Sequence, residues 1–158
     1  MIDLAATTPV VEALAARLRD RGWRLAVAES CTGGLVAAAC TSVAGSSDWF
    51  DRGFVTYSNA AKTQMLGVDA GLIAAHGAVS AAVAEAMAAG ALAHADAELA
   101  LAVTGIAGPG GAVPGKPVGT VWLGLARRSR APSSERLQLQ GDRGAVRAQT
   151  VAIGLQRL

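Results

Sequence analysis

The sequence predicts a three-layer α/β/α domain, in which helices cover both faces of a mixed, mostly parallel sheet of about five strands. Short apolar segments alternate with helical patterns along most of the chain, as expected for parallel strands joined by helices. Near the end, two strand patterns at 118–126 and 134–140 are joined by a short arginine-rich tip, so a hairpin makes the sheet mixed. A chain of 158 residues has the length of one domain, and we expect a single domain over 1–158.

The first elements read clearly from the sequence. A helix is expected to begin at Thr8 and Pro9, because proline's missing N–H costs least at a helix start. It should end near Gly22, and a strand at 24–29 then leads into the turn 30–34 and a second helix. Such a strand–turn–helix leaves free backbone N–H groups, so the turn is expected to be an anion site or a plain capped turn. The buried stripe of the first helix consists of Val10, Val11, Leu14 and Leu18.

The middle of the chain continues the alternation. A short strand at 54–57 precedes a helix that carries Lys62, and a short helix follows at 69–76. Ser80 should cap a long helix with a face of small side chains. That face can approach the helix's own sheet closely, or a second subunit, and we expect it to pack on the sheet.

The last third contains the most buried strand pattern. Residues 98–104 are apolar on both possible faces and are expected at the centre of the sheet. They end in the glycine-rich loop 105–111, whose main chain a planar or anionic ligand could approach, although a purely structural tight loop is the alternative. Residues 141–143 start the final helix, where Arg143 could bind a phosphate or carboxylate, or be a solvated capping residue.

Composition excludes several classes of protein. The net charge of +2 is too small to indicate nucleic-acid binding. The most apolar run, 81–103, is interrupted by four ionisable side chains, so we expect no membrane span. The acidic start at 1–3 does not resemble a targeting segment. Cys31 and Cys40 have no partner pattern, and with two histidines elsewhere they indicate neither disulfide nor zinc site. We therefore expect a cytoplasmic protein without metal or cofactor.

Lysine is scarce in this chain and indicates possible chemistry. Lys62 and Lys116 are the lysines among 14 basic side chains. A partly buried lysine can lose its proton and act as a base, whereas arginine stays charged. Serine hydroxyls near such an amine suggest nucleophilic catalysis without histidine or metal, the alternative being a solvated Lys62. From chemistry alone, the candidate nucleophiles stay open: Ser30, Ser46, Ser47 and Ser58.

Three polar loops follow predicted strands, at 30–34, 57–62 and 104–111. In open α/β sheets, ligands bind beyond the carboxyl ends of the strands. The three loops would thus place hydroxyls, a lysine and bare backbone N–H groups in one pocket.

Six sequence blocks occur in a fixed order over most of the chain: 28–34 (AESCTGG), 45–62 (GSSDWFDRGFVTYSNAAK), 76–80 (HGAVS), 104–111 (TGIAGPGG), 116–121 (KPVGTV) and 141–143 (GDR). In these blocks the chain resembles the C-terminal domain of the competence/damage-inducible CinA family, whose stand-alone form is a nicotinamide-nucleotide amidase. The resemblance implies hydrolysis of the carboxamide of nicotinamide mononucleotide to nicotinate mononucleotide and ammonia. It also implies a serine–lysine pair that works without metal or cofactor.

The resemblance further implies roles for individual residues. It assigns the nucleophile to Ser47, the base to Lys62, and a helper that orients or relays the proton to Tyr57. Substrate contacts are expected from Ser30, Thr32, Gly33, Ser46, Thr104, Gly105 and Arg143. The expected partners are a small-molecule substrate and a second copy of the chain in a homodimer, with no nucleic acid and no membrane.

Two other functions compete with this interpretation. A non-catalytic nucleotide-binding or regulatory domain would use the same glycine and hydroxyl loops to hold phosphate and sugar. An interaction module would instead present the small-residue face of 81–93 to a partner.

Overall fold

The computed structural model describes residues 4–158 and contains one mixed sheet of five strands in the order β2-β1-β3-β4-β5. β2, β1 and β3 run parallel, whereas β4 is antiparallel to both β3 and β5. The predicted α/β class with a mixed sheet is confirmed. The strands are β1 (Leu25–Glu29), β2 (Phe50–Val55), β3 (Leu99–Gly105), β4 (Thr120–Arg127) and β5 (Ser133–Gln138).

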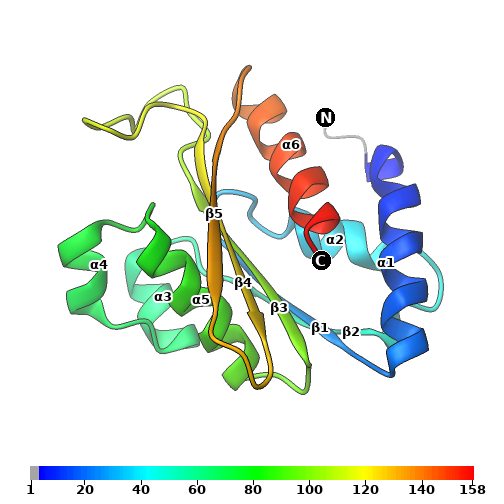
Figure 1. Ribbon diagram of the computed structural model, residues 1–158. Helices are drawn as coiled ribbons and strands as arrows, with labels where there is room; N and C mark the ends of the chain where they lie inside the picture. Colours follow the sequence, from blue (N-terminus) through cyan, green and yellow to red (C-terminus); the bar gives the residue numbers. More distant parts are fainter. Residues whose placement is uncertain (1–3) are drawn as a thin grey trace.

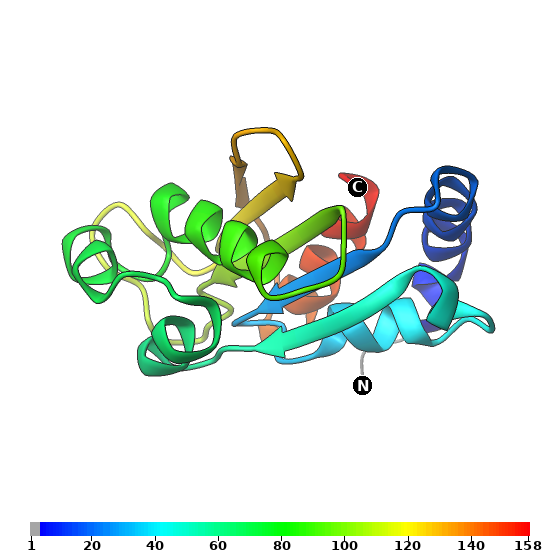
Figure 2. The same ribbon diagram turned by 90° about the horizontal axis from the view of Figure 1, so that it is seen from below.

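Helices cover both faces of this sheet (Figures 1 and 2). One face is covered by α1 (Thr8–Arg21), α2 (Leu35–Thr41) and α6 (Arg143–Gln156). The other is covered by α3 (Asn59–Leu66) and α5 (Ala81–Ala93), and α4 (Ala70–His76) packs against these two helices. Two short 3-10 turns, η1 (Leu4–Thr7) and η2 (Ser46–Asp48), precede α1 and β2. Among residues 4–158, no helix is both long and apolar enough to cross a bilayer.

The two central strands are buried on both faces, and each face has its own core. On the α1/α2/α6 side, large side chains such as Val27 and Leu101 form one cluster. On the α5 side, the same strands present alanines, among them Ala26 and Ala100. This follows from the two-residue repeat of a strand, which sends neighbouring side chains to opposite faces. The alanine side leaves room for α5 to lie very close to the sheet.

Glycines make that close approach possible. A Cβ on Gly124 of β4 would overlap the backbone carbonyl of Ala84 in α5. A Cβ on Gly90 of α5 would likewise overlap the carbonyl of Leu66 at the end of α3. The expectation that the small-residue face of α5 packs on its own sheet is confirmed.

Helix starts follow the predicted capping chemistry. Ser80 Oγ accepts from the Val83 N–H at the start of α5, and the Gly22 backbone, at φ 63°, ends α1 in the left-handed region. The second strand differs from its prediction: it spans Phe50–Val55 instead of 54–57. Phe50 already pairs with Leu25 of β1, so pairing with a buried neighbour extends a strand that has little alternation of its own.

Candidate active site

Lys62 and Ser30 lie side by side at the carboxyl end of the parallel strands. Lys62 Nζ is 3.0 Å from Ser30 Oγ, 2.9 Å from the Thr56 carbonyl oxygen and 3.4 Å from that of Tyr57. The Lys62 side chain is buried, with 1% of its surface exposed. The amine therefore has three polar neighbours, two of which can only accept a hydrogen bond.

The surroundings of Lys62 favour its neutral form. Burial lowers the pKa of its amine, and a negative charge on Cys31 would oppose this. Burial also raises the pKa of the Cys31 thiol to about 11, so that thiol carries no charge near neutral pH. A neutral amine has two N–H donors and one lone pair. Nζ donates to Ser30 Oγ and to the two carbonyls. Loss of one proton leaves two N–H groups for the carbonyls and a lone pair facing the serine hydroxyl, which is what a base for the serine proton requires.

Local structure fixes Lys62 in this place. Ser58 caps α3 by accepting from the Ala61 N–H, and the helix follows β2 after three residues, which puts Lys62 in its first turn. The far end of α3 rests against Gly90. The predicted helix with its serine cap is confirmed, and Ser58 is engaged in that cap.

Ser30 is held where β1 ends. Its backbone N–H donates to the Val103 carbonyl at 2.9 Å, which extends the pairing of β1 and β3. Gly33 and Gly34 then adopt positive φ angles of 59° and 101°, which glycine tolerates better than other residues. This tight turn leads directly into α2.

The start of α2 is already occupied by a buried carboxylate. Glu29 is 1% exposed, and its oxygens accept from the N–H groups of Gly34, Val36 and Ala37 at 3.0, 3.0 and 2.9 Å. The expected anion site at turn 30–34 is therefore wrong for these N–H groups, because the protein supplies the anion itself. The sequence did contain a signal for this: a glutamate that ends an apolar strand immediately before a helix.

Ser47 is not brought to Lys62. It lies exposed on η2, before β2 begins, whereas Lys62 follows the end of that strand. The six residues of β2, at about 3.3 Å each, separate the two ends by about 20 Å. The expectation that Ser47 is the hydroxyl beside Lys62 is corrected: the hydroxyl there is that of Ser30. Ser46 shares the remote position of Ser47.

Tyr57 and Arg143 meet beside this centre. Arg143 Nη2 lies 2.9 Å from the Tyr57 hydroxyl, and Nη1 donates to the Gly108 carbonyl at 2.9 Å. The Tyr57 side chain is largely exposed, so its contact with Lys62 is through its main-chain carbonyl. Arg143 thus joins the loop after β3 to the segment between β2 and α3.

The remaining predicted residues surround the same end of the sheet. Thr104 is buried and donates from Oγ1 to the Ala78 carbonyl at 2.9 Å, which ties β3 to the segment before α5. A Cβ on Gly105 would lie 2.7 Å from a Val121 side-chain carbon, so close strand packing explains that glycine. The Thr32 hydroxyl is fully buried and has no hydrogen-bond partner among the described residues. It is a buried hydroxyl whose hydrogen-bonding capacity is not used within the described residues.

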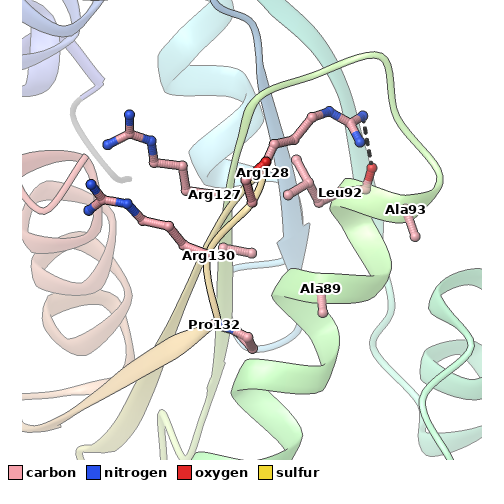
Figure 3. Close-up of a pocket in the computed structure, with 9 residues that line it drawn as sticks. Ala89, Leu92, Ala93, Arg127, Arg128, Arg130 and Pro132 are labelled. Atoms are coloured by element: carbon pink, nitrogen blue, oxygen red, sulfur yellow. Dashed lines mark hydrogen bonds between the residues drawn. The ribbon is translucent and has the colours of Figure 1, made fainter.

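A cavity of about 380 Å³ lies elsewhere, between α5 and the tip of the β4–β5 hairpin. Figure 3 shows Arg128 reaching across it to the Leu92 carbonyl, while Arg127 and Arg130 point to the other side of the hairpin. Its polar side chains are arginines and Ser129, none of which is a base near neutral pH. The chemistry of the side chains therefore places the candidate site at Ser30 and Lys62.

Within residues 4–158, no three His, Cys, Asp or Glu side chains gather closely enough to hold a metal ion. The described part of the chain combines a mixed α/β sheet with a serine hydroxyl against a buried lysine. The fold and this contact define the class of the protein as an α/β domain with a serine hydroxyl hydrogen-bonded to a buried lysine.

The chain belongs to the CinA C-terminal domain family, whose family model matches residues 7–158. It is 52% identical to the nicotinamide-nucleotide amidohydrolase PncC of Escherichia coli K12 over 89% of this chain and 86% of the relative. The corresponding protein of Pseudomonas putida is 52% identical over 96% of this chain and 94% of the relative. A CinA-like protein of Geobacter sp. strain M21 is 57% identical over 92% of this chain, which spans only 35% of that protein.

Solved structures agree with this membership. The competence damage-inducible protein A of Klebsiella pneumoniae is 42% identical, with a TM-score of 0.92 over 96% of this chain and 93% of that one. The competence/damage-inducible protein of Agrobacterium tumefaciens is 45% identical, with a TM-score of 0.86 over 94% of this chain and 93% of that one.

Proposed function

We propose that this chain is an amidohydrolase that converts nicotinamide mononucleotide to nicotinate mononucleotide and ammonia, with Ser30 as nucleophile and Lys62 as base. The observation that carries the proposal is the buried Lys62 amine, with its lowered pKa, 3.0 Å from Ser30 Oγ. The names of relatives at 52% identity over most of their length support the substrate.

Acylation begins at the serine. Neutral Lys62 takes the Ser30 proton as Oγ forms a bond to the carboxamide carbon, and the carbonyl oxygen becomes negative. When the tetrahedral intermediate collapses, the C–N bond breaks and Lys62 returns the proton to the departing ammonia. The product of this half-reaction is an ester between Ser30 and the nicotinoyl group.

Backbone donors next to Ser30 suit the negative oxygen. The Thr32 N–H has no hydrogen-bond partner in the described part of the chain, and the Cys31 N–H contacts only its own thiol. Main-chain N–H groups immediately after a nucleophile are a common source of oxyanion stabilisation. We assign that role to these two groups.

Deacylation reverses the roles. Lys62 removes a proton from a water molecule, whose oxygen forms a bond to the ester carbon, and the C–Oγ bond then breaks. The proton passes from Lys62 back to Ser30 Oγ, which restores both groups. Nicotinate mononucleotide leaves with its new carboxylate.

The remaining site residues would hold the nucleotide. Arg143, an exposed guanidinium held by Tyr57 and Gly108, suits the phosphate. The unpartnered Thr32 hydroxyl suits a polar group of the nicotinamide. In this assignment Tyr57 orients Arg143, whereas the resemblance implies a helper that orients or relays the proton.

Ammonia release from the purified protein tests the proposal, with nicotinamide mononucleotide, nicotinamide riboside and the dinucleotide as substrates. Wild type should release ammonia from the mononucleotide, and Ser30→Ala should not. Saturable binding of the mononucleotide without ammonia release would instead favour the non-catalytic nucleotide-binding domain.

We further propose that residues 1–158 act as one domain, as a homodimer in the cytoplasm. The buried, unpaired Cys31 and Cys40 suit a reducing compartment. The edge strand β2 ends in exposed Val55, and Met65 of α3 is also exposed, which suits burial against a second copy. Sedimentation equilibrium tests the dimer, and a monomer at all concentrations would contradict it.

A further inference from the structure

Arg147 of α6 holds the turn that carries Ser30. Its Nε donates to the Cys31 carbonyl at 3.1 Å, and its Nη2 donates to the Thr32 carbonyl at 3.0 Å. The side chain is half-buried, and α6 lies beside α2 on the same face of the sheet (Figure 1). The planar fork of a guanidinium fixes both carbonyls relative to each other, because its donors are rigidly spaced.

The turn needs such support. Gly33 and Gly34 give it backbone freedom that other residues lack. Glu29 accepts from N–H groups on the α2 side of the turn, and Arg147 donates to carbonyls earlier in the turn. In the segment that follows Ser30, backbone N–H groups thus bind the buried Glu29 carboxylate, and backbone carbonyls bind the Arg147 guanidinium.

The contact also determines where one donor points. In a planar trans peptide, the C=O and N–H groups point in opposite directions. Because the Cys31 carbonyl faces Arg147, the N–H of Thr32 in the same peptide faces away from Arg147. Within residues 4–158 that N–H has no partner. The guanidinium charge also polarises the peptide, which makes the Thr32 N–H a stronger donor.

We propose that Arg147 is a positioning residue of the reaction: it aims and polarises the Thr32 N–H that stabilises the oxyanion. The inference rests on the proposed function of Ser30 as nucleophile. Arg147 acts through the main chain of the turn and does not touch the substrate. Removal of the Arg147 guanidinium should slow the steps that build negative charge on the oxyanion, and it should leave substrate binding nearly unchanged.

A fluorophosphonate probe tests this without the natural substrate. Ser30 Oγ forms a bond to phosphorus, the P–F bond breaks, and fluoride leaves, while Lys62 takes the serine proton. Mass spectrometry locates the adduct. Arg147→Gln should slow labelling by about 30-fold, and Arg147→Lys, which keeps one donor, should slow it less. With nicotinamide mononucleotide, kcat should fall by a similar factor while KM stays within about twofold.

Arg128→Gln is the matched control. Arg128 also donates to two backbone carbonyls, those of Leu92 and Ala95. It follows Arg127, which pairs with Leu99 at the start of β3, whereas Ser30 lies at the end of β3. The Arg128→Gln variant should be labelled at the wild-type rate. Equal slowing of labelling in Arg128→Gln and Arg147→Gln would overturn the inference. If Arg147→Gln fails to fold, the labelling rate of Arg147→Lys provides the test. A folded Arg147 variant that is labelled at the wild-type rate refutes the positioning role. Labelling of wild type at a residue other than Ser30 would overturn the proposed nucleophile, and this inference with it.

Discussion

Lys62 Nζ lies 3.0 Å from Ser30 Oγ across 32 positions of sequence, because β1 and β2 run parallel and end at the same edge of the sheet. The relationship leads to a direct test of the nucleophile. Ser30→Ala should lower kcat by about a thousandfold or more, whereas Ser47→Ala should stay within about twofold of wild type. Steady-state ammonia release measures both. Loss of activity in Ser47→Ala with a functional Ser30→Ala would refute the assignment.

The pH profile should show the base. A neutral Lys62 is required, so kcat/KM should rise with pH through the pKa of this amine, and burial places the midpoint below the ordinary value of 10.5. Between that midpoint and 10.5 the unfolded chain binds one more proton, so this group makes stability rise with pH there. Initial rates across a broad pH range give the profile, and activity that falls through the same range would contradict it.

Replacing the base with arginine should affect both activity and stability. Lys62→Arg introduces a group that cannot lose its proton, so turnover should disappear. Because the position is buried, the variant must also bury a charge, and the free energy of unfolding should drop by about 2 kcal/mol. Urea unfolding measures this loss, with Arg136→Lys on the exposed surface of β5 as the control, and a Lys62→Arg variant as stable as wild type would contradict it.

Glu29 should stabilise the turn beneath the nucleophile. Glu29→Gln replaces a carboxylate that accepts three backbone N–H groups with an amide that turns one end into a donor. The free energy of unfolding should fall by about 2 kcal/mol, and kcat should fall with it. Chemical denaturation measures the first quantity. Glu12→Gln, on the exposed face of α1, should change neither.

Close packing behind α3 should matter to the position of Lys62. In Gly90→Ala, the new methyl group overlaps the Leu66 carbonyl and pushes α3 away from α5. We expect a loss of about 2 kcal/mol in stability, together with lower kcat. Thermal unfolding and ammonia release measure the two effects. Ala89→Ser, on the exposed face of the same helix, is the control. A Gly90→Ala variant with wild-type stability and kcat would contradict the expected displacement of α3.

Much of the fold was predictable because local chemistry and tertiary structure agree. Ser80 both caps and begins α5, and the apolar strand around Leu101 lies at the centre of the sheet. The edge strand was predicted too short, because its first residues become a strand only by pairing with β1. Sequence patterns therefore predict an element best where its own residues, and not its pairing with a distant segment, determine its secondary structure.

The site was predicted in part, for a related reason. Lys62 was identified by its scarcity and spacing, and Ser30 was expected as a pocket hydroxyl. Ser47 was chosen as nucleophile from the resemblance, although it precedes a strand whose far end carries Lys62. The direction of the strands indicates Ser30 instead, because the loops that follow parallel strands lie at one edge of the sheet. Arg147 could not be found in this way, because its partners are backbone carbonyls with no signature in sequence.

Glu29 has a consequence for inhibitor chemistry. A sulfate, phosphonate or tetrazole designed to sit on the first turn of α2 would meet an internal carboxylate that already fills the position and repels it. Negatively charged compounds should therefore gain affinity through Arg143, and their competition with substrate should weaken as ionic strength rises.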